Sequence, residues 1–193
     1  GTREFGKKAR DSVSPVDVVT IRQLTATGQP TLRDAVALLL PAVTTPTGGF
    51  VPGALTTTIS LRGLNPKETL VLVDGKRLHT TTNIYADPGP MQGATPVDID
   101  MIPMASIDHI EVLRDGASAQ YGSDAVAGVV NIILKKQANG LTMRSNSGIT
   151  SQGDGFQQGV FLDGGFNIHN RGFVHIGGDF VHQDHTYRSG ADS

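Results

Sequence analysis

The chain has 193 residues, 24 glycines, no cysteine, no tryptophan and a formal net charge of −2. The lack of cysteine excludes disulfides and thiolate metal sites, and the near-neutral charge gives no electrostatic basis for nucleic-acid binding. No stretch approaches the roughly 18 consecutive apolar residues of a membrane helix. The chain carries no initiator methionine or signal peptide, so we expect a mature or trimmed chain.

Strand and helix signals follow a polar lead-in over residues 1–12. Val16–Thr20 is a predicted strand. Thr20 and Gln23 form a capping box, which starts a short helix. Thr31 starts a second helix, which Pro41 ends. Apolar residues recur at helical spacing in this second helix, which predicts a core-facing stripe of Leu32, Ala35, Val36 and Leu39.

The middle of the chain alternates strand signals with irregular stretches. Residues 42–54 hold prolines and glycines and predict a loop. Thr56–Leu61 and Thr69–Val73 are predicted strands, and Asp74-Gly75 is a dipeptide favoured in two-residue hairpin turns. The stretch His79–Pro103 is irregular, and a loop of that length in a compact domain is usually functional or disordered.

Two apolar runs, Ile107–Leu113 and Val129–Leu134, are joined by a short connector. The second run has only Asn131 as a polar residue, which is typical of a strand buried on both faces. Ala117–Tyr121 predicts one helical turn in the connector. Its glycines permit a positive φ or a close backbone approach, so the chain can fold back tightly at Gly116, Gly122 and Gly128.

After Lys136 the pattern changes to alternation. Apolar and polar residues alternate through residues 160–168 and 174–180, a turn lies at 169–172, and residues 141–149 carry a weaker version. Strands of about 9–11 residues that are apolar on one side are typical of a transmembrane β-barrel. A half-buried hairpin in a soluble protein shows the same alternation, so this pattern alone leaves both open.

A family resemblance favours the β-barrel over the hairpin of a soluble protein. The run from Glu111 to Ile132, EVLRDGASAQYGSDAVAGVVNI, resembles the signature near the end of the plug domain of TonB-dependent outer-membrane receptors. Leu61–Gly63 and Leu70–Gly75 match two earlier plug motifs in the right order. The resemblance covers roughly residues 13–136. The energy-coupling box that precedes the plug in this family is not found in residues 1–12.

The resemblance implies a fold and a division of the chain. Residues 13–136 are expected to form a small mixed α/β plug, and residues 137–193 the first antiparallel strands of an incomplete transmembrane β-barrel. The expected central sheet comprises Thr56–Leu61, Thr69–Val73, Ile107–Leu113 and Val129–Leu134. Such a barrel has roughly 22 strands, so we expect the chain to be the N-terminal part of a longer receptor.

The resemblance also implies a function. The plug would gate energy-coupled import of an iron chelate, cobalamin or carbohydrate across the outer membrane of a Gram-negative cell. The implied partners are TonB, outer-membrane lipid and the transported small-molecule ligand, with no nucleic acid. No cofactor and no metal are expected.

Two sets of residues are candidates for this function. Arg62, Glu111 and Arg114 lie beside strands predicted to be buried, where an unpaired charge is costly. The resemblance implies that they make ionic contacts between plug and barrel, whereas an internal ion pair is the alternative. The family's usual Gly-Pro after this arginine is here Asp115-Gly116. The second set is expected on loops that face the ligand: Phe50, Asn83, Tyr85, Asp87 and Met91.

Other functions have weaker support. The carboxylates between residues 98 and 124 lack the spacing of a calcium loop, and Ser118 lacks the final glycine of a nucleophile elbow. On a strand, His182 and Asp184 share a face while His185 points away, so they do not force a metal site. An enzyme is therefore not expected. The alternative function is a soluble periplasmic ligand-binding or signalling module.

Overall fold

A computed structural model of the chain describes residues 16–44, 58–86, 92–95, 97–114, 116–136, 139–168 and 171–185. The chain divides into two compact units. Unit 1 comprises Gly1–Ile102 and Ile107–Lys135, and unit 2 comprises Pro103–Ser106 and Lys136–Ser193. Over the ranges just given, no helix has the length and apolar content needed to cross a membrane.

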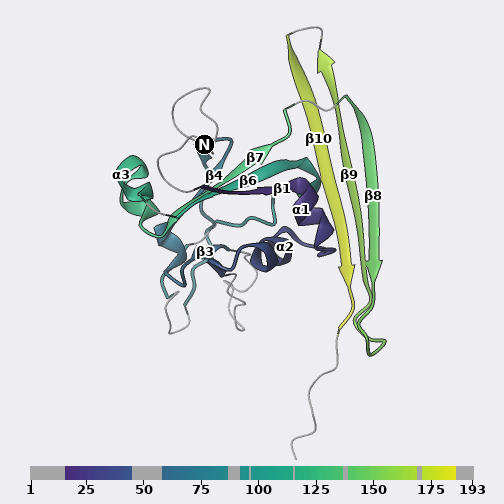
Figure 1. The fold of residues 1–193 in the computed structure, drawn as a ribbon, viewed down its shortest axis with the longest axis horizontal. Coiled ribbons are helices and arrows are strands. Elements are labelled where there is room, and N and C mark those ends of the chain that lie inside the picture. The colour runs from purple at the N-terminus through teal and green to yellow at the C-terminus, as the bar shows by residue number, and fades with distance from the viewer. Residues whose placement is uncertain are drawn as a thin grey trace, which may run out of the picture. The chain divides into compact units, whose positions relative to one another are not determined.

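Unit 1 is built on a five-stranded sheet with the strand order β1-β6-β7-β4-β5. β1 and β6 pair antiparallel, as do β6 and β7, whereas β7 and β4 run parallel. Figure 1 shows helices α1 (Ile21–Ala26) and α2 (Leu32–Leu39) together on one side of this sheet. The strands are β1 (Val16–Thr20), β4 (Thr69–Val73), β5 (Lys76–Arg77), β6 (Ile107–Leu113) and β7 (Gly128–Leu134).

Both predicted helix starts are confirmed. The Gln23 backbone N–H donates to Thr20 Oγ1 at 3.4 Å, and the Thr20 N–H donates to Gln23 Oε1 at 2.9 Å, which completes the capping box of α1. Thr31 caps α2 by accepting the Asp34 backbone N–H at 3.2 Å. The predicted stripe of α2 is buried at Leu32, Ala35 and Val36, while Leu39 is half-buried.

The connector between β6 and β7 contains the predicted helical turn as α3 (Ala117–Tyr121), followed by the 3-10 helix η5 (Ser123–Ala125). All three of its glycines have positive φ, at 70°, 88° and 136° for Gly116, Gly122 and Gly128. At Gly128 a Cβ atom would lie 2.6 Å from the Leu113 carbonyl oxygen, so the close backbone approach requires glycine. Ala117 and Ala125 then pack against Leu70, Leu72 and Val129.

The Asp74-Gly75 turn is also confirmed. Val73 pairs with Lys76, so two residues make the turn between β4 and β5. The φ angles of 48° at Asp74 and 76° at Gly75 belong to a turn of type I′, whose twist matches that of the strands.

The prediction that Thr56–Leu61 belongs to the central sheet is wrong for its described residues, 58–61. Ser60–Leu61 forms β3, which pairs with β2 (Val43–Thr44), inside the predicted loop 42–54, as a separate two-stranded sheet. The Leu61 N–H bonds the side-chain oxygen of Thr69, the first residue of β4, at 3.1 Å, so β3 meets the central sheet through a side chain and not through backbone strand pairing. The two neighbours of β4 are β7 and the local hairpin strand β5, so no position beside β4 is left.

Unit 2 contains three antiparallel strands in the order β10-β9-β8. They are β8 (Gly140–Gly148), β9 (Gln157–Ile168) and β10 (Gly172–Gln183), of 9, 12 and 12 residues. Each is long enough for a tilted crossing of a bilayer, which needs about 9–11 residues. The 3-10 helix η4 (Met104–Ser106) belongs to this unit although the chain on both sides of it belongs to unit 1.

Candidate functional site

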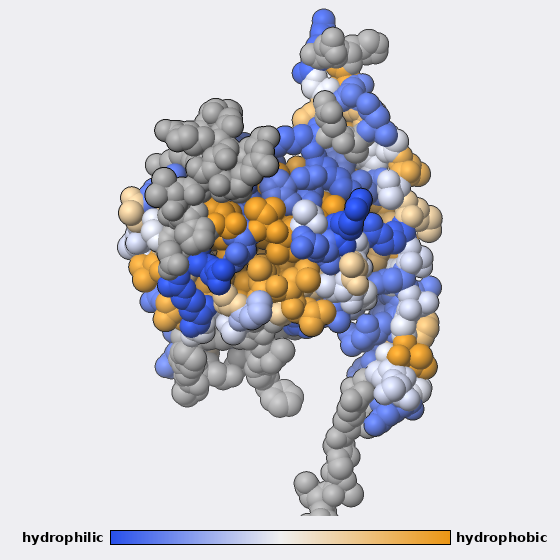
Figure 2. Space-filling model, viewed as in Figure 1, coloured by the Kyte–Doolittle hydropathy of each residue, from blue (hydrophilic) through white to orange (hydrophobic). Residues whose placement is uncertain are grey.

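The sheet of unit 2 has one apolar face. Leu141 and Ile176 both lie opposite Gly164 of the middle strand, so their side chains share this face. Leu141 is 78% exposed and Ile176 67%. Figure 2 shows apolar residues along the right-hand margin of the view, where these strands lie. The other large apolar residues of the face are Met143, Val160, Leu162, Phe166, Ile168, Val174 and Phe180.

The opposite face of the same sheet is more polar, although it also carries Phe161, Phe173 and Val181. Asp163 Oδ1 of β9 lies 2.5 Å from His175 Nε2 of β10, and both side chains are nearly buried. His175 and Asp179 share this face, as the alternation predicts. A sheet that is apolar on one face and polar on the other can separate lipid from a water-filled lumen.

A polar pair lies within the sheet of unit 1. Glu111 of β6 and Asn131 of β7 are directly opposite and are 8% and 7% exposed. Asn131 Nδ2 donates to Glu111 Oε2 at 3.0 Å, and the Gly75 backbone N–H donates to Asn131 Oδ1 at 3.0 Å. His109 Nε2 lies 3.7 Å from Glu111 Oε1. One asparagine therefore connects the carboxylate of β6 to the turn after β4.

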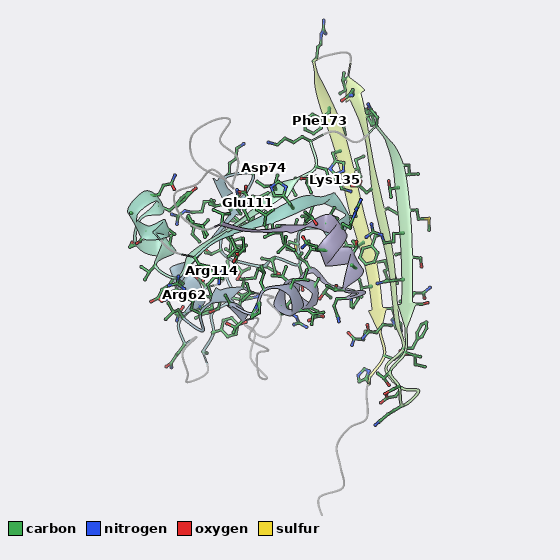
Figure 3. All side chains as sticks on the ribbon, viewed as in Figure 1. Arg62, Asp74, Glu111, Arg114, Lys135 and Phe173 are labelled. Carbon is green, nitrogen blue, oxygen red and sulfur yellow. The ribbon has the colours of Figure 1, made fainter. Side chains whose placement is uncertain are left out.

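The two candidate arginines come together at another place in unit 1. The Arg62 guanidinium donates to the Arg114 carbonyl, and Arg114 Nη2 lies 2.6 Å from Asp17 Oδ2 of β1. The side chains of Arg114 and Asp17 are 41% and 37% exposed, so their ion pair contributes at most about 1 kcal/mol. Figure 3 shows Arg62 beside Arg114, with Glu111 apart from both.

The structure thus contains the internal pair that was the alternative for Arg114. Whether Arg62, Glu111 and Arg114 also contact a barrel wall stays a prediction. Asp17 was missed in the sequence because its partner lies far along the chain, and no local spacing marks such a pair.

Two of the five candidate loop residues lie in the described chain. Asn83 is half-buried, and Tyr85 is 4% exposed. The Tyr85 N–H donates to the Ala94 carbonyl at 3.0 Å, and the Gly93 N–H donates to the Tyr85 carbonyl at 2.7 Å. Burial, and then the negative charge of Asp98, raises the pKa of the Tyr85 phenol. Tyr85 therefore holds two parts of the loop together. Phe50, Asp87 and Met91 lie outside the described residues.

Two further charged pairs lie on the surface, Arg77–Asp124 and His182–Asp184. The Arg77 guanidinium, which bonds Asp124 and attracts its charge, holds the pKa of that carboxyl below its usual range. His182 Nε2 lies 3.0 Å from Asp184 Oδ1, and both side chains are more than half exposed. Among the described residues, no three His, Asp or Glu side chains gather closely enough to hold a metal ion.

Comparison with known proteins identifies the family. Residues 8–129, more than half of the chain, match the family described as the TonB-dependent Receptor Plug Domain. The chain belongs to this family. The matched residues include β1, β4, β5 and β6, together with Glu111 and the two arginines, and end at the start of β7.

Two relatives show how far the similarity extends. The probable TonB-dependent siderophore receptor PirA of Acinetobacter baumannii is 41% identical over 111 residues, which is 57% of this chain and 14% of that protein. The vitamin B12 transporter BtuB of Vibrio cholerae is 32% identical over 146 residues, which is 75% of this chain and 22% of that protein. The chain thus spans less than a quarter of the length of either relative.

Solved structures share the fold. The crystal structure of the siderophore receptor PirA from Acinetobacter baumannii aligns with 90% of this chain and 25% of its own, at a TM-score of 0.66 and 25% identity. The ferric citrate transporter FecA in its unliganded form aligns with 91% of this chain and 26% of its own, at a TM-score of 0.61 and 22% identity. The predicted fold class, a mixed α/β plug followed by antiparallel strands, is confirmed.

The two relatives are named a siderophore receptor and a vitamin B12 transporter, which agrees with the prediction that the chain is not an enzyme. The comparisons give no support to a soluble binding module.

Proposed function

We propose that this chain closes the lumen of an outer-membrane transporter and opens it when TonB supplies energy. The observation that supports this most strongly is the combination of two features in one chain. A plug of the TonB-dependent family is followed directly by strands with one exposed apolar face and one polar face. A wall that faces lipid on one side and a wet plug on the other needs this asymmetry.

The contacts of such a plug must be strong enough to seal and weak enough to break. Polar, partly hydrated contacts meet this requirement better than a continuous apolar interface, because exposed ion pairs contribute only about 0–1 kcal/mol each. Arg62 and Arg114 are suited to this role, since both keep part of their guanidinium surface near solvent. Glu111 is better placed to stabilise the sheet, because it is buried and bonded to Asn131.

For the substrate we propose an iron chelate of the siderophore class, with cobalamin as the second candidate. The relative with 41% identity is named a siderophore receptor, and the one with 32% identity covers more of this chain and is named a vitamin B12 transporter. The ligand would meet the plug at the loops that contain Phe50, Asn83, Asp87 and Met91, with Tyr85 anchoring the second loop.

The test is an uptake assay with the full-length gene product. The host strain lacks its own receptors for the two probes, and uptake is compared between cells with TonB and cells without it. Radiolabelled ferric enterobactin and cyanocobalamin are the two probes. We expect TonB-dependent uptake of the ferric chelate. Uptake that is unaffected by loss of TonB, or no uptake of either probe, would contradict the proposed function in this form.

A further inference from the structure

One short segment of the plug sequence belongs structurally to the strands that follow the plug. The chain leaves unit 1 after Ile102 and returns to it at Ile107, and the four residues between them cluster with unit 2. These residues include η4, in which Met104 is 3% exposed and Ser106 8%.

The strand β10 holds η4 through two neighbouring positions on its polar face. At Gly177, a Cβ atom would collide with Ser106 Oγ and would lie 3.2 Å from Ser106 Cβ and 3.5 Å from the Ser106 nitrogen. Two residues further on, Asp179 Oδ2 accepts the Met104 backbone N–H at 3.4 Å. Gly177 leaves room for η4 because it has no side chain. The Asp179 carboxylate accepts one of the first N–H groups of η4, which has no partner within the helix.

The adjacent glycine shows that this is a specific fit. Gly178 points to the opposite, apolar face, where a Cβ atom would have no neighbour within 4 Å. Successive residues of a strand face opposite sides, so only Gly177 of the pair can serve the polar face. The Gly-Gly sequence by itself does not distinguish the two.

We propose that Gly177 and Asp179 form a fixed attachment site for η4 and that this segment stays on β10 while the rest of the plug rearranges during import. The proposal rests on the proposed function, because it assigns β10 to the transporter wall. Residues 107–135 would then be joined to the wall at both ends, through Ser106 and through Lys136. Residues before Pro103 would be joined to the wall through Pro103.

A reversible cross-link tests this directly in the full-length protein. Ser106→Cys together with Gly177→Cys places two thiols across the contact, whose Cβ separation of 3.2 Å is close to the usual disulfide range of about 3.5–4.5 Å. The described chain contributes no competing thiol, because it contains no cysteine. The matched control is Ser106→Cys with Gly178→Cys, whose second thiol faces the other side of the sheet.

We expect the first pair, and not the control, to form a disulfide in the resting protein, as measured by mass spectrometry of the linked peptide. Uptake of radiolabelled ferric enterobactin or cyanocobalamin should be the same within about twofold before and after reduction. Two outcomes would overturn the proposal: no disulfide in the first pair, or uptake that is lost on oxidation and restored by reductant. If the wild-type protein imports neither probe, the proposed function fails, and disulfide formation alone then decides the attachment.

A second set of variants covers the case in which the double-cysteine protein does not assemble. Met104→Cys is expected to resist a membrane-impermeant maleimide, because the side chain is 3% exposed. Gly177→Ala adds a Cβ atom that collides with Ser106 Oγ and, unlike the cysteine pair, forms no bond that holds η4 against this collision. Adding Gly177→Ala should therefore displace η4 and raise labelling at least about fivefold, whereas adding Gly178→Ala should not. Combining Gly177→Ala with Ser106→Gly should restore protection, because the colliding atoms are gone. Equal labelling in all four proteins would refute the attachment.

Discussion

At the scale of single residues, Gly128 has the most crowded position among the described glycines of the plug. Its φ of 136° is a conformation that other residues rarely adopt, and a Cβ atom would also lie 2.7 Å from Leu61 Cδ1. Gly122 has a φ of 88° but open space around it. We expect Gly122→Ala to cost about 1 kcal/mol from backbone strain and Gly128→Ala at least about 3 kcal/mol, because a steric clash is added.

The measurement for these two variants is a urea midpoint. It is the urea concentration at which a protease cleaves half of the plug in the detergent-solubilised, full-length protein. Gly122→Ala is the control, since it changes φ strain without a contact. Equal midpoints for the two variants would show that the close approach to Leu113 and Leu61 contributes nothing.

The buried pair Glu111–Asn131 predicts a pH dependence. Asn131→Asp would place a second carboxylate at the position whose amide now donates to Glu111. Repulsion and burial raise the pKa of both carboxyls in the folded plug, so the folded state binds more protons than the unfolded state. Stability of this variant should therefore fall as pH rises above about 4, the ordinary carboxyl pKa.

Asn131→Leu is the matched control, because it removes the same hydrogen bonds without adding a charge. It should lose about 1–3 kcal/mol, from the unpaired Gly75 N–H and the weakened contact of Glu111. This loss should change much less with pH. Urea midpoints at pH 4.5 and 7.5 check both variants, and parallel pH curves would contradict the prediction.

Local chemistry made several of these residues predictable from sequence. The capping box of Thr20 and Gln23 and the positive φ of Gly128 depend on neighbours within a few positions, and both were predicted. Asp17 and Gly177 were not, because each acts on a residue more than 70 positions away. Only the folded chain shows that Gly177 and Gly178 differ.

At the scale of elements, the hairpin of β4 and β5 depends on its turn. Asp74 has a φ of 48°, and its Oδ1 accepts the Leu134 backbone N–H at 3.2 Å. Asp74→Asn keeps both the tolerance for this conformation and an acceptor oxygen, so it should change stability by less than about 0.5 kcal/mol. Asp74→Ala should cost about 1–2 kcal/mol. The same protease-detected urea midpoint distinguishes them, and an equal cost would show that the side-chain bond is unimportant.

The two faces of β8 lead to a prediction about membrane assembly. Met143 is 67% exposed on the apolar face, and its neighbour Thr142 is exposed on the polar face. If the apolar face meets lipid, Met143→Arg should cost up to about 2–4 kcal/mol, depending on its depth in the bilayer. Thr142→Arg should be tolerated. The readout is the fraction of folded barrel on an unheated gel, and equal assembly of both variants would mean that β8 does not face lipid.

Sequence patterns predicted which segments form strands better than they predicted strand partners. Ile107–Leu113 was predicted as the strand that the structure shows, and the apolar residues between its polar ones suffice for that. Thr56–Leu61 was assigned to the wrong sheet, because a threonine-rich extended segment carries no information on its neighbour. The far edge of the central sheet is β1, which pairs with a strand about 90 residues later.

At the scale of the whole molecule, the two units depend on different physical requirements. Unit 1 buries its apolar residues in a core, as a domain surrounded by water requires, and has one polar pair within its sheet. Unit 2 instead exposes the apolar face of its sheet. The second arrangement is costly in water unless another apolar medium or partner covers it. A motif of 22 residues indicated this combination in the sequence, while the alternation in residues 160–180 alone did not distinguish a barrel from a soluble hairpin.

The role of Arg114 is a question for the complete receptor, and a pair of variants answers it. Within the plug Arg114 pairs with Asp17, so Asp17→Asn and Arg114→Ala remove the same internal ion pair. If that pair is the whole role of Arg114, both variants should loosen the plug slightly and equally, by at most about 1 kcal/mol.

If Arg114 also contacts the barrel wall, as we propose, only Arg114→Ala should weaken closure of the lumen. The measurement is entry of a bulky antibiotic that an intact outer membrane excludes, and we expect at least about a fourfold greater sensitivity with Arg114→Ala than with Asp17→Asn. Equal sensitivity at equal receptor levels would limit Arg114 to the internal pair.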